Sequence, residues 1–208
     1  IAAPSSADDR EGFYLSLSGL FGIAEDSPIH SQNFGATPAA TNAVLNALNA
    51  KVDTGIGLSF AHAAGFKFDS GFRAEAEFSY RDADLDRAFS SAGSTVINGD
   101  INIKSWLFNA VYDFETYTRF TPYLGYGVGV ALQEGSLSTI GGIPAGLGKG
   151  TDVTFAYQIL TGVVYSLNDN VDVGVGYRYF GTSNPDFGFF ASEIDIHNLE
   201  VTLRYYFF

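Results

Sequence analysis

Residues 121–133 have the sequence TPYLGYGVGVALQ, in which bulky and small side chains alternate. One parity holds Leu124, Tyr126, Val128, Val130 and Leu132, and the other holds Gly125, Gly127, Gly129 and Ala131. Successive side chains of a β-strand point to opposite faces, so the segment predicts a strand with one bulky apolar face and one narrow face. Its length suits a membrane-crossing strand, which needs about 9–11 tilted residues.

Seven further segments alternate in a similar way. They are residues 12–24, 53–68, 72–81, 101–114, 153–167, 171–180 and 198–207. Segment 101–114 is less regular, because Leu107 and Val111 share the parity of the polar Asn109 and Asp113. The eight segments make an even number of strands, as in single-chain bacterial membrane barrels.

The connections between these segments alternate in length. Short ones lie at 69–71, 115–120 and 168–170, and long ones near 26–52, 83–100, 134–152 and 181–196. Outer-membrane barrels have short periplasmic turns and long external loops. The sequence therefore predicts an all-β fold, an eight-stranded antiparallel up-and-down transmembrane β-barrel over residues 12–208, with residues 1–11 as a short periplasmic tail.

The first long loop carries a weak helical signal. Thr37 precedes Pro38, as at a helix start, and good helix formers follow to Ala50. Residues 37–50 are therefore expected to form either a short lid over the barrel or a partly ordered surface loop.

Composition supports a membrane barrel. The 208 residues are 46% hydrophobic, 15% aromatic and 16% charged, with 24 glycines, yet no apolar run approaches the roughly 18 residues of a transmembrane helix. The net charge of −12 argues against nucleic-acid binding, and the lack of cysteine excludes disulfides and thiolate sites. Because the chain begins at Ile1 and not at Met, we expect that a targeting segment has been cleaved.

A soluble lipocalin-type barrel is the structural alternative. It would have to line its cavity with Glu75, Glu77, Arg178 and Arg204, or expose Tyr and Val on nearly every strand. Both arrangements are unfavourable in water, so the pattern favours a lipid-facing exterior.

Three runs carry a family resemblance. Residues 122–131, 172–179 and 201–208 resemble the fifth, seventh and last strands of small outer-membrane β-barrel proteins of the opacity and surface-antigen type, a porin-like barrel domain. The resemblance implies a location in a Gram-negative outer membrane, contact with lipid and lipopolysaccharide, and a surface role. It also implies that the barrel-assembly machinery reads Tyr205, Phe207 and Phe208. Phe208 departs from the family pattern, since Phe207 shares the parity of the preceding apolar residues.

The narrow parity also carries charges, which are expected to point into the lumen. These are Arg73, Glu75, Glu77, Arg81, Asp113, Arg178, Glu200 and Arg204. Four of each sign form a neutral set, and an isolated buried charge is costly. We therefore expect a salt-bridged plug in which Glu75 and Glu77 reach across to Arg178 and Arg204. The alternative is a narrow gated channel for small solutes, lined by the same residues.

Other candidate sites are weaker. Asp82, Asp84 and Asp86 alternate at an outer strand end, but they lack the Gly and terminal Glu of a calcium loop and are interpreted as a solvated acidic cluster. Some related barrels are lipid A deacylases with a His and a Ser on one strand. None of His30, His62 and His197 has a Ser two residues later, so no catalysis, metal or cofactor is expected. The external loops or the barrel wall remain candidates for protein partners or self-association.

Overall fold

The computed structural model describes residues 10–24, 27–28, 30–31, 51–54, 58–90, 93–114, 116, 118–140, 143–144, 149–183, 190–191 and 194–207. The possible helix at 37–50 lies outside these residues. Within the described part of the chain, no helix is long and apolar enough to cross a membrane.

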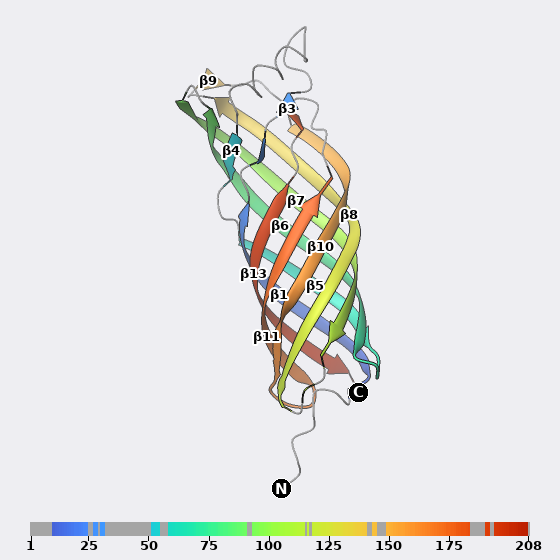
Figure 1. Cartoon of the computed structure of the whole chain (residues 1–208). Helices are drawn as coiled ribbons and strands as arrows, with labels where there is room; N and C mark the ends of the chain where they lie inside the picture. The colour runs from blue at the N-terminus through green and yellow to red at the C-terminus, as the bar shows by residue number, and fades with distance from the viewer. Residues whose placement is uncertain are drawn as a thin grey trace.

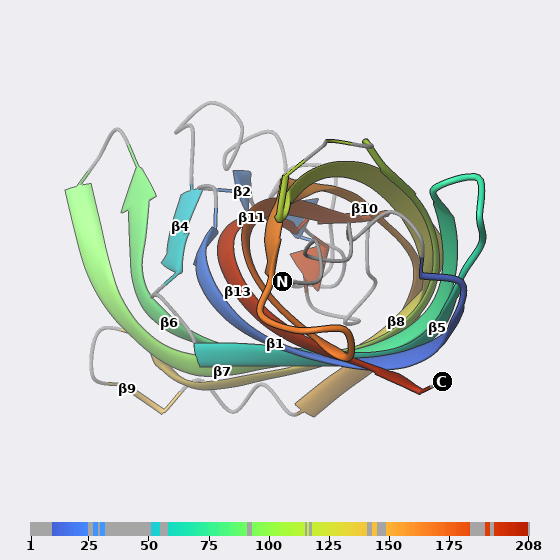
Figure 2. The ribbon, with the colours of Figure 1, turned by 90° about the horizontal axis from the view of Figure 1, so that it is seen from below.

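Eight long strands form a closed antiparallel barrel (Figures 1 and 2), which confirms the predicted fold. They are β1 (Gly12–Ala24), β5 (Leu58–Lys67), β6 (Phe72–Ser90), β7 (Gly93–Asp113), β8 (Phe120–Ile140), β10 (Lys149–Ser166), β11 (Val171–Thr182) and β13 (Asp195–Phe207). Their order around the barrel is β6-β5-β1-β13-β11-β10-β8-β7, and the pairing of β7 with β6 closes it.

Five short strands lie beyond this set. They are β2 (Ser27–Pro28), β3 (His30–Ser31), β4 (Lys51–Thr54), β9 (Ile143–Pro144) and β12 (Phe190–Ala191). The first barrel strand is separated from the second by the long connection that contains β2, β3 and β4. Of these, β4 pairs with β6 and β3 pairs with β12, so this connection packs on other external segments.

Alternating burial separates the two faces of the wall. In β13 the residues from Leu199 to Phe207 are alternately exposed and buried. Bulky apolar side chains form the outside, and Phe108 is 74% exposed. The lumen takes the other parity, as the sequence predicts, and lipid is the solvent that suits such an exterior.

The strands differ in length, and this changes the expected external loops. β6 and β7 pair from Phe72↔Tyr112 to Ser90↔Gly93, so most of the expected 83–100 loop is a β-hairpin. β8 and β10 pair as far as Ser136↔Lys149, within the expected 134–152 loop. Backbone pairing continues there although the side-chain alternation fades. The extended ends of β6, β7 and β8 project from the barrel at the end away from the start of β1 (Figure 1).

The short turns lie at the opposite end. Gly71 has a φ of +81°, and a Cβ there would lie 2.9 Å from the Asp113 carbonyl oxygen. Its amide donates to the Phe68 carbonyl over 3.1 Å. Glycine is therefore required for the tight turn that joins β5 to β6.

Candidate functional site

The eight predicted lumenal charges all belong to the inward parity. Seven are buried, and the Glu75 side chain is 9% exposed. The structure divides them into a central group, a group toward the short turns, and Arg81, which stands apart.

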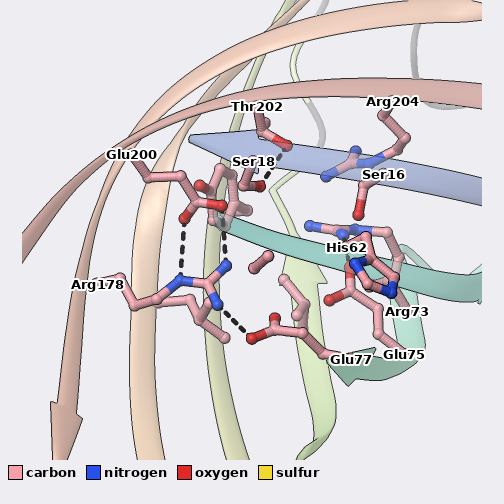
Figure 3. Close-up of a pocket in the computed structure, with 15 residues that line it drawn as sticks. Ser16, Ser18, His62, Arg73, Glu75, Glu77, Arg178, Glu200, Thr202 and Arg204 are labelled. Carbon is pink, nitrogen blue, oxygen red and sulfur yellow. Dashed lines mark hydrogen bonds and ion pairs between the residues drawn. The ribbon is translucent and has the colours of Figure 1, made fainter. Parts of the chain in front are cut away.

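The central group spans the barrel through Arg178 (Figure 3). Its Nη1 donates to Glu77 Oε1 over 2.5 Å, and its Nη2 donates to Glu200 Oε1 over 2.8 Å. These residues lie on β11, β6 and β13, and β6 and β11 are four strand positions apart in either direction around the barrel. The predicted contact of Glu77 with Arg178 thus joins opposite walls.

The group toward the short turns is built on Arg73. Its Nε donates to both Asp113 carboxylate oxygens over 3.0 Å, and its Nη1 is paired with Glu75. Tyr14 donates to Glu75 Oε1 over 2.5 Å. We expected Glu75 to reach across the barrel to Arg178 or Arg204, but its ion pair is with Arg73, which lies two residues away on the same face of β6.

Asn109 connects the two groups. Its Nδ2 lies 3.1 Å from Glu75 Oε2 and 2.9 Å from Glu77 Oε2, while Gln158 Nε2 donates to Asn109 Oδ1 over 2.8 Å. Gly127 makes room for this arrangement, because a Cβ at that position would overlap Asn109 Oδ1. The inward glycines of β8 therefore serve a crowded lumen.

Three more charges lie near the short-turn end of the lumen. Arg10 donates to Asp172 Oδ1 and to Ser166 Oγ, each over 2.7 Å, and its Cζ lies 4.6 Å from the centre of the Tyr206 ring. Arg204 Nη1 lies 3.6 Å from Asp172 Oδ2, and Lys67 Nζ lies 3.9 Å from Asp113 Oδ2. The parity of Lys67 and Asp172 was the available signal for their position. Arg10 lies in the expected periplasmic tail, where no alternating pattern of side chains could indicate that it faces the lumen.

These additions change the charge balance of the lumen. The buried cations are Arg10, Lys67, Arg73, Arg81, Arg178 and Arg204, and the carboxylates are Glu75, Glu77, Asp113, Asp172 and Glu200. The described lumen therefore holds one cation more than it holds carboxylates, and the predicted neutral set was incomplete.

Arg81 does not join an ion pair with any described residue. Its Nη1 donates to Ser79 Oγ over 2.6 Å and lies 3.3 Å from Ser105 Oγ. Its Cζ lies 3.8 Å from the centre of the Phe180 ring. The expected place of Arg81 in a salt-bridged plug is therefore wrong, because the carboxylates lie nearer to the short turns.

Apolar layers fill much of the remaining lumen. The outer layer consists of Ile101, Ile103, Leu107, Ala131, Ala156, Phe180 and Ile196. The inner layer consists of Val111, Tyr123, Leu160 and Val164. Leu107 and Val111, which made the alternation of 101–114 irregular, thus pack inside the barrel. A cavity of about 20 Å³ lies among Arg73, Arg178 and Arg204 (Figure 3), room for about one water.

The acidic cluster is not a regular face. Asp82 is exposed and Asp84 lies opposite Asp100, but the register shifts between Leu85 and Arg87, which leaves Asp86 outside the paired positions. Such a bulge interrupts the alternation that the prediction assumed. No group of three metal-ligating side chains occurs in the part of the chain that the structure describes.

The C-terminal residues and the histidines lie mostly on the outer wall. Tyr205 and Phe207 are exposed, with ring centres 5.1 Å apart, and Phe208 lies outside the described residues. His62 contacts the Phe78 ring, and His197 Nδ1 is hydrogen-bonded to the Tyr177 hydroxyl. His30 pairs through its backbone with Ala191.

The chain resembles known outer-membrane proteins. It is 30% identical over 97 residues to the outer membrane protein PagN of Salmonella typhimurium strain LT2, covering 44% of this chain and 39% of PagN. It is 26% identical over 197 residues to an outer membrane protein of Gluconacetobacter diazotrophicus, covering 89% of this chain and 51% of that protein. The chain thus spans at most about half the length of these relatives.

Two solved structures share the fold. Neisserial surface protein A (NspA) has a TM-score of 0.61 at 19% identity, covering 94% of this chain and 97% of NspA. OprG from Pseudomonas aeruginosa has a TM-score of 0.53 at 12% identity, covering 96% and 98%. Residues 1–207 match the family described as the outer membrane protein beta-barrel domain. The chain belongs to this family of multi-pass barrels in the Gram-negative outer membrane.

Proposed function

We propose that this protein is a closed barrel whose role is structural and surface-exposed, with recognition by the segments outside the membrane. The main support for a closed lumen is the pair of ion pairs that Arg178 makes with Glu77 and Glu200, called here the Arg178 bridge. One guanidinium binds Glu77 and Glu200 from opposite and adjacent walls, and all three side chains are buried.

Packing supports the same proposal. Both apolar layers are buried and adjoin the central ion pairs, because Leu107 of the outer layer pairs with Glu77 and Leu160 of the inner layer pairs with Arg178. The cavity near Arg178 is close to the size of one water molecule. Eight-stranded barrels have interiors that side chains just fill, so this lumen offers little space for a solute.

The external strands support the surface role. β6, β7 and β8 have 19, 21 and 21 residues, against 10 in β5 and 13 in β1. A membrane-crossing strand needs about 9–11 residues, so β6–β8 present backbone well beyond the bilayer. A protein partner or a second copy would bind there or at the external loops.

The proposal also covers lipid contact, the C-terminal assembly signal and catalysis. The wall contacts lipid and lipopolysaccharide through its aromatic side chains, and the assembly machinery reads the outward Tyr205 and Phe207 together with Phe208. The proposal includes no enzymatic activity, so purified protein is expected to release no acyl chain from lipid A.

Release of a small solute from proteoliposomes tests the closed lumen. We expect the wild-type protein to release trapped glycine no faster than empty liposomes do. Arg178→Met, with Glu200→Gln as a second variant, is expected to accelerate release, whereas Lys104→Ala on the outer wall serves as the control. Rapid release by the wild type would support the alternative of a narrow channel.

A further inference from the structure

We propose that Arg81 forms a binding site for a small oxoanion, of the carboxylate class, in the outer half of the lumen. The site lies beyond the central ion pairs and goes further than the proposed surface role. It rests on the geometry of one buried guanidinium and on the groups that hold it.

The guanidinium of Arg81 is held on one edge and one face. Its Nη1 contacts the Ser79 and Ser105 hydroxyls, and its plane lies over the Phe180 ring with Cζ 3.8 Å from the ring centre. Nε and Nη2 are buried and have no hydrogen-bond partner. These two nitrogens form the side of the guanidinium that binds both oxygens of a carboxylate.

Among the described residues, no carboxylate forms an ion pair with the Arg81 guanidinium, and the side chain is 1% exposed. A buried cation without a paired anion is costly. An anion at Nε and Nη2 would remove this cost and would also balance the single excess cation of the lumen.

Neighbouring groups suit a small polar ligand. Arg81 lies opposite Ile103, and Ile103 lies opposite Gln133, so these residues face the lumen on three adjacent strands. Gln133 Oε1 is also buried without a partner, which makes it an acceptor for a ligand that carries a hydroxyl. Ile103 and its apolar neighbours must move to admit any ligand, and this restricts the site to small oxoanions.

The ligand would enter from outside the cell. On β6, Glu77 is nearer than Arg81 to the turn at 69–71, and the Arg178 bridge closes the lumen at the level of Glu77. Arg81 lies on the external side of this bridge, opposite Ile103 and against Phe180 of the outer apolar layer. Binding at this site therefore does not require the barrel to conduct.

Titration with ¹³C-formate tests the site, using full-length protein in phospholipid nanodiscs at constant ionic strength with chloride as the replaced anion. We expect saturable broadening of the formate signal with the wild type. Arg81→Met should weaken binding roughly ten- to a hundredfold, the effect of losing charge-assisted hydrogen bonds. Lys104→Met, which removes an exposed cation from the outer wall, should leave it unchanged.

Arg81→Lys distinguishes loss of the binding site from loss of the fold, because lysine keeps the positive charge but lacks the edge formed by Nε and Nη2. We expect this variant to remain folded and to bind formate more weakly than the wild type. Equal binding by wild type and Arg81→Lys, or no saturable binding by the wild type, would overturn the proposal. In the second case, destabilisation by Arg81→Lys would show that a carboxylate of the chain itself occupies the edge.

Discussion

The central and outer parts of the lumen are filled by different kinds of side chain. In the central part, Arg178 binds Glu77 and Glu200, and Asn109 and Gln158 extend the hydrogen bonds. In the outer part, Arg81 lies against the Phe180 ring and contacts the Ser79 and Ser105 hydroxyls, and two of its nitrogens have no partner. The comparison shows that lumenal parity predicts burial but does not predict pairing. Substitutions in each part should therefore have different signatures.

The largest effect is expected in the central part. Arg178→Met leaves Glu77 and Glu200 buried without their cation, and we expect the free energy of unfolding to fall by about 3–5 kcal/mol. Urea unfolding in phospholipid vesicles, followed by the fluorescence of the single tryptophan, Trp106, measures this. Adding Glu77→Gln and Glu200→Gln should restore part of the loss, and no recovery would show that the charges are not the cause.

Phe180→Ala examines the outer part. The side chain is fully buried in the outer layer, so its removal should cost about 3–5 kcal/mol, at or below the effect of Arg178→Met. The same urea titration applies. Because the loss comes from packing, Phe180→Leu should recover much of it. Equal losses for Ala and Leu would indicate that the ring contact with Arg81 dominates instead.

Gly127→Ala tests whether the lumen is too crowded to accept an added methyl group on β8. A Cβ would overlap Asn109 Oδ1, so we expect a loss of about 1–3 kcal/mol as the network shifts. Gly19→Ala is the matched control, because nothing lies within 4 Å of a Cβ there. Similar effects of the two substitutions would contradict a crowded lumen on the β8 side.

The smallest effect is expected for an ion pair outside the lumen. Lys104 Nζ lies 3.0 Å from Glu134 Oε2, and their side chains are 35% and 45% exposed. Solvent-exposed pairs contribute about 0–1 kcal/mol, so Lys104→Ala should change the free energy of unfolding by less than 1 kcal/mol. A loss comparable to that of Arg178→Met would mean that burial does not distinguish the two pairs.

The sequence predicted the wall of the barrel better than its interior. Alternation around Gly125, Gly127 and Gly129 is a local property, so it identified strands and faces. The partner of Glu75 depends on which lumenal side chains lie at the same level along the barrel axis. Parity indicates the face of a strand but not this level. Arg10 lies before the first strand and had no periodic signal. The β6–β7 hairpin continues through residues whose alternation is too weak to distinguish it from a loop.

Current recording across planar bilayers tests the closed lumen most directly, with wild-type protein and Arg178→Met compared under the same voltage. If the Arg178 bridge closes the barrel, the wild type will show no stable conductance steps and Arg178→Met will show them. Stable steps from the wild type that remain unchanged in Arg178→Met would contradict the account.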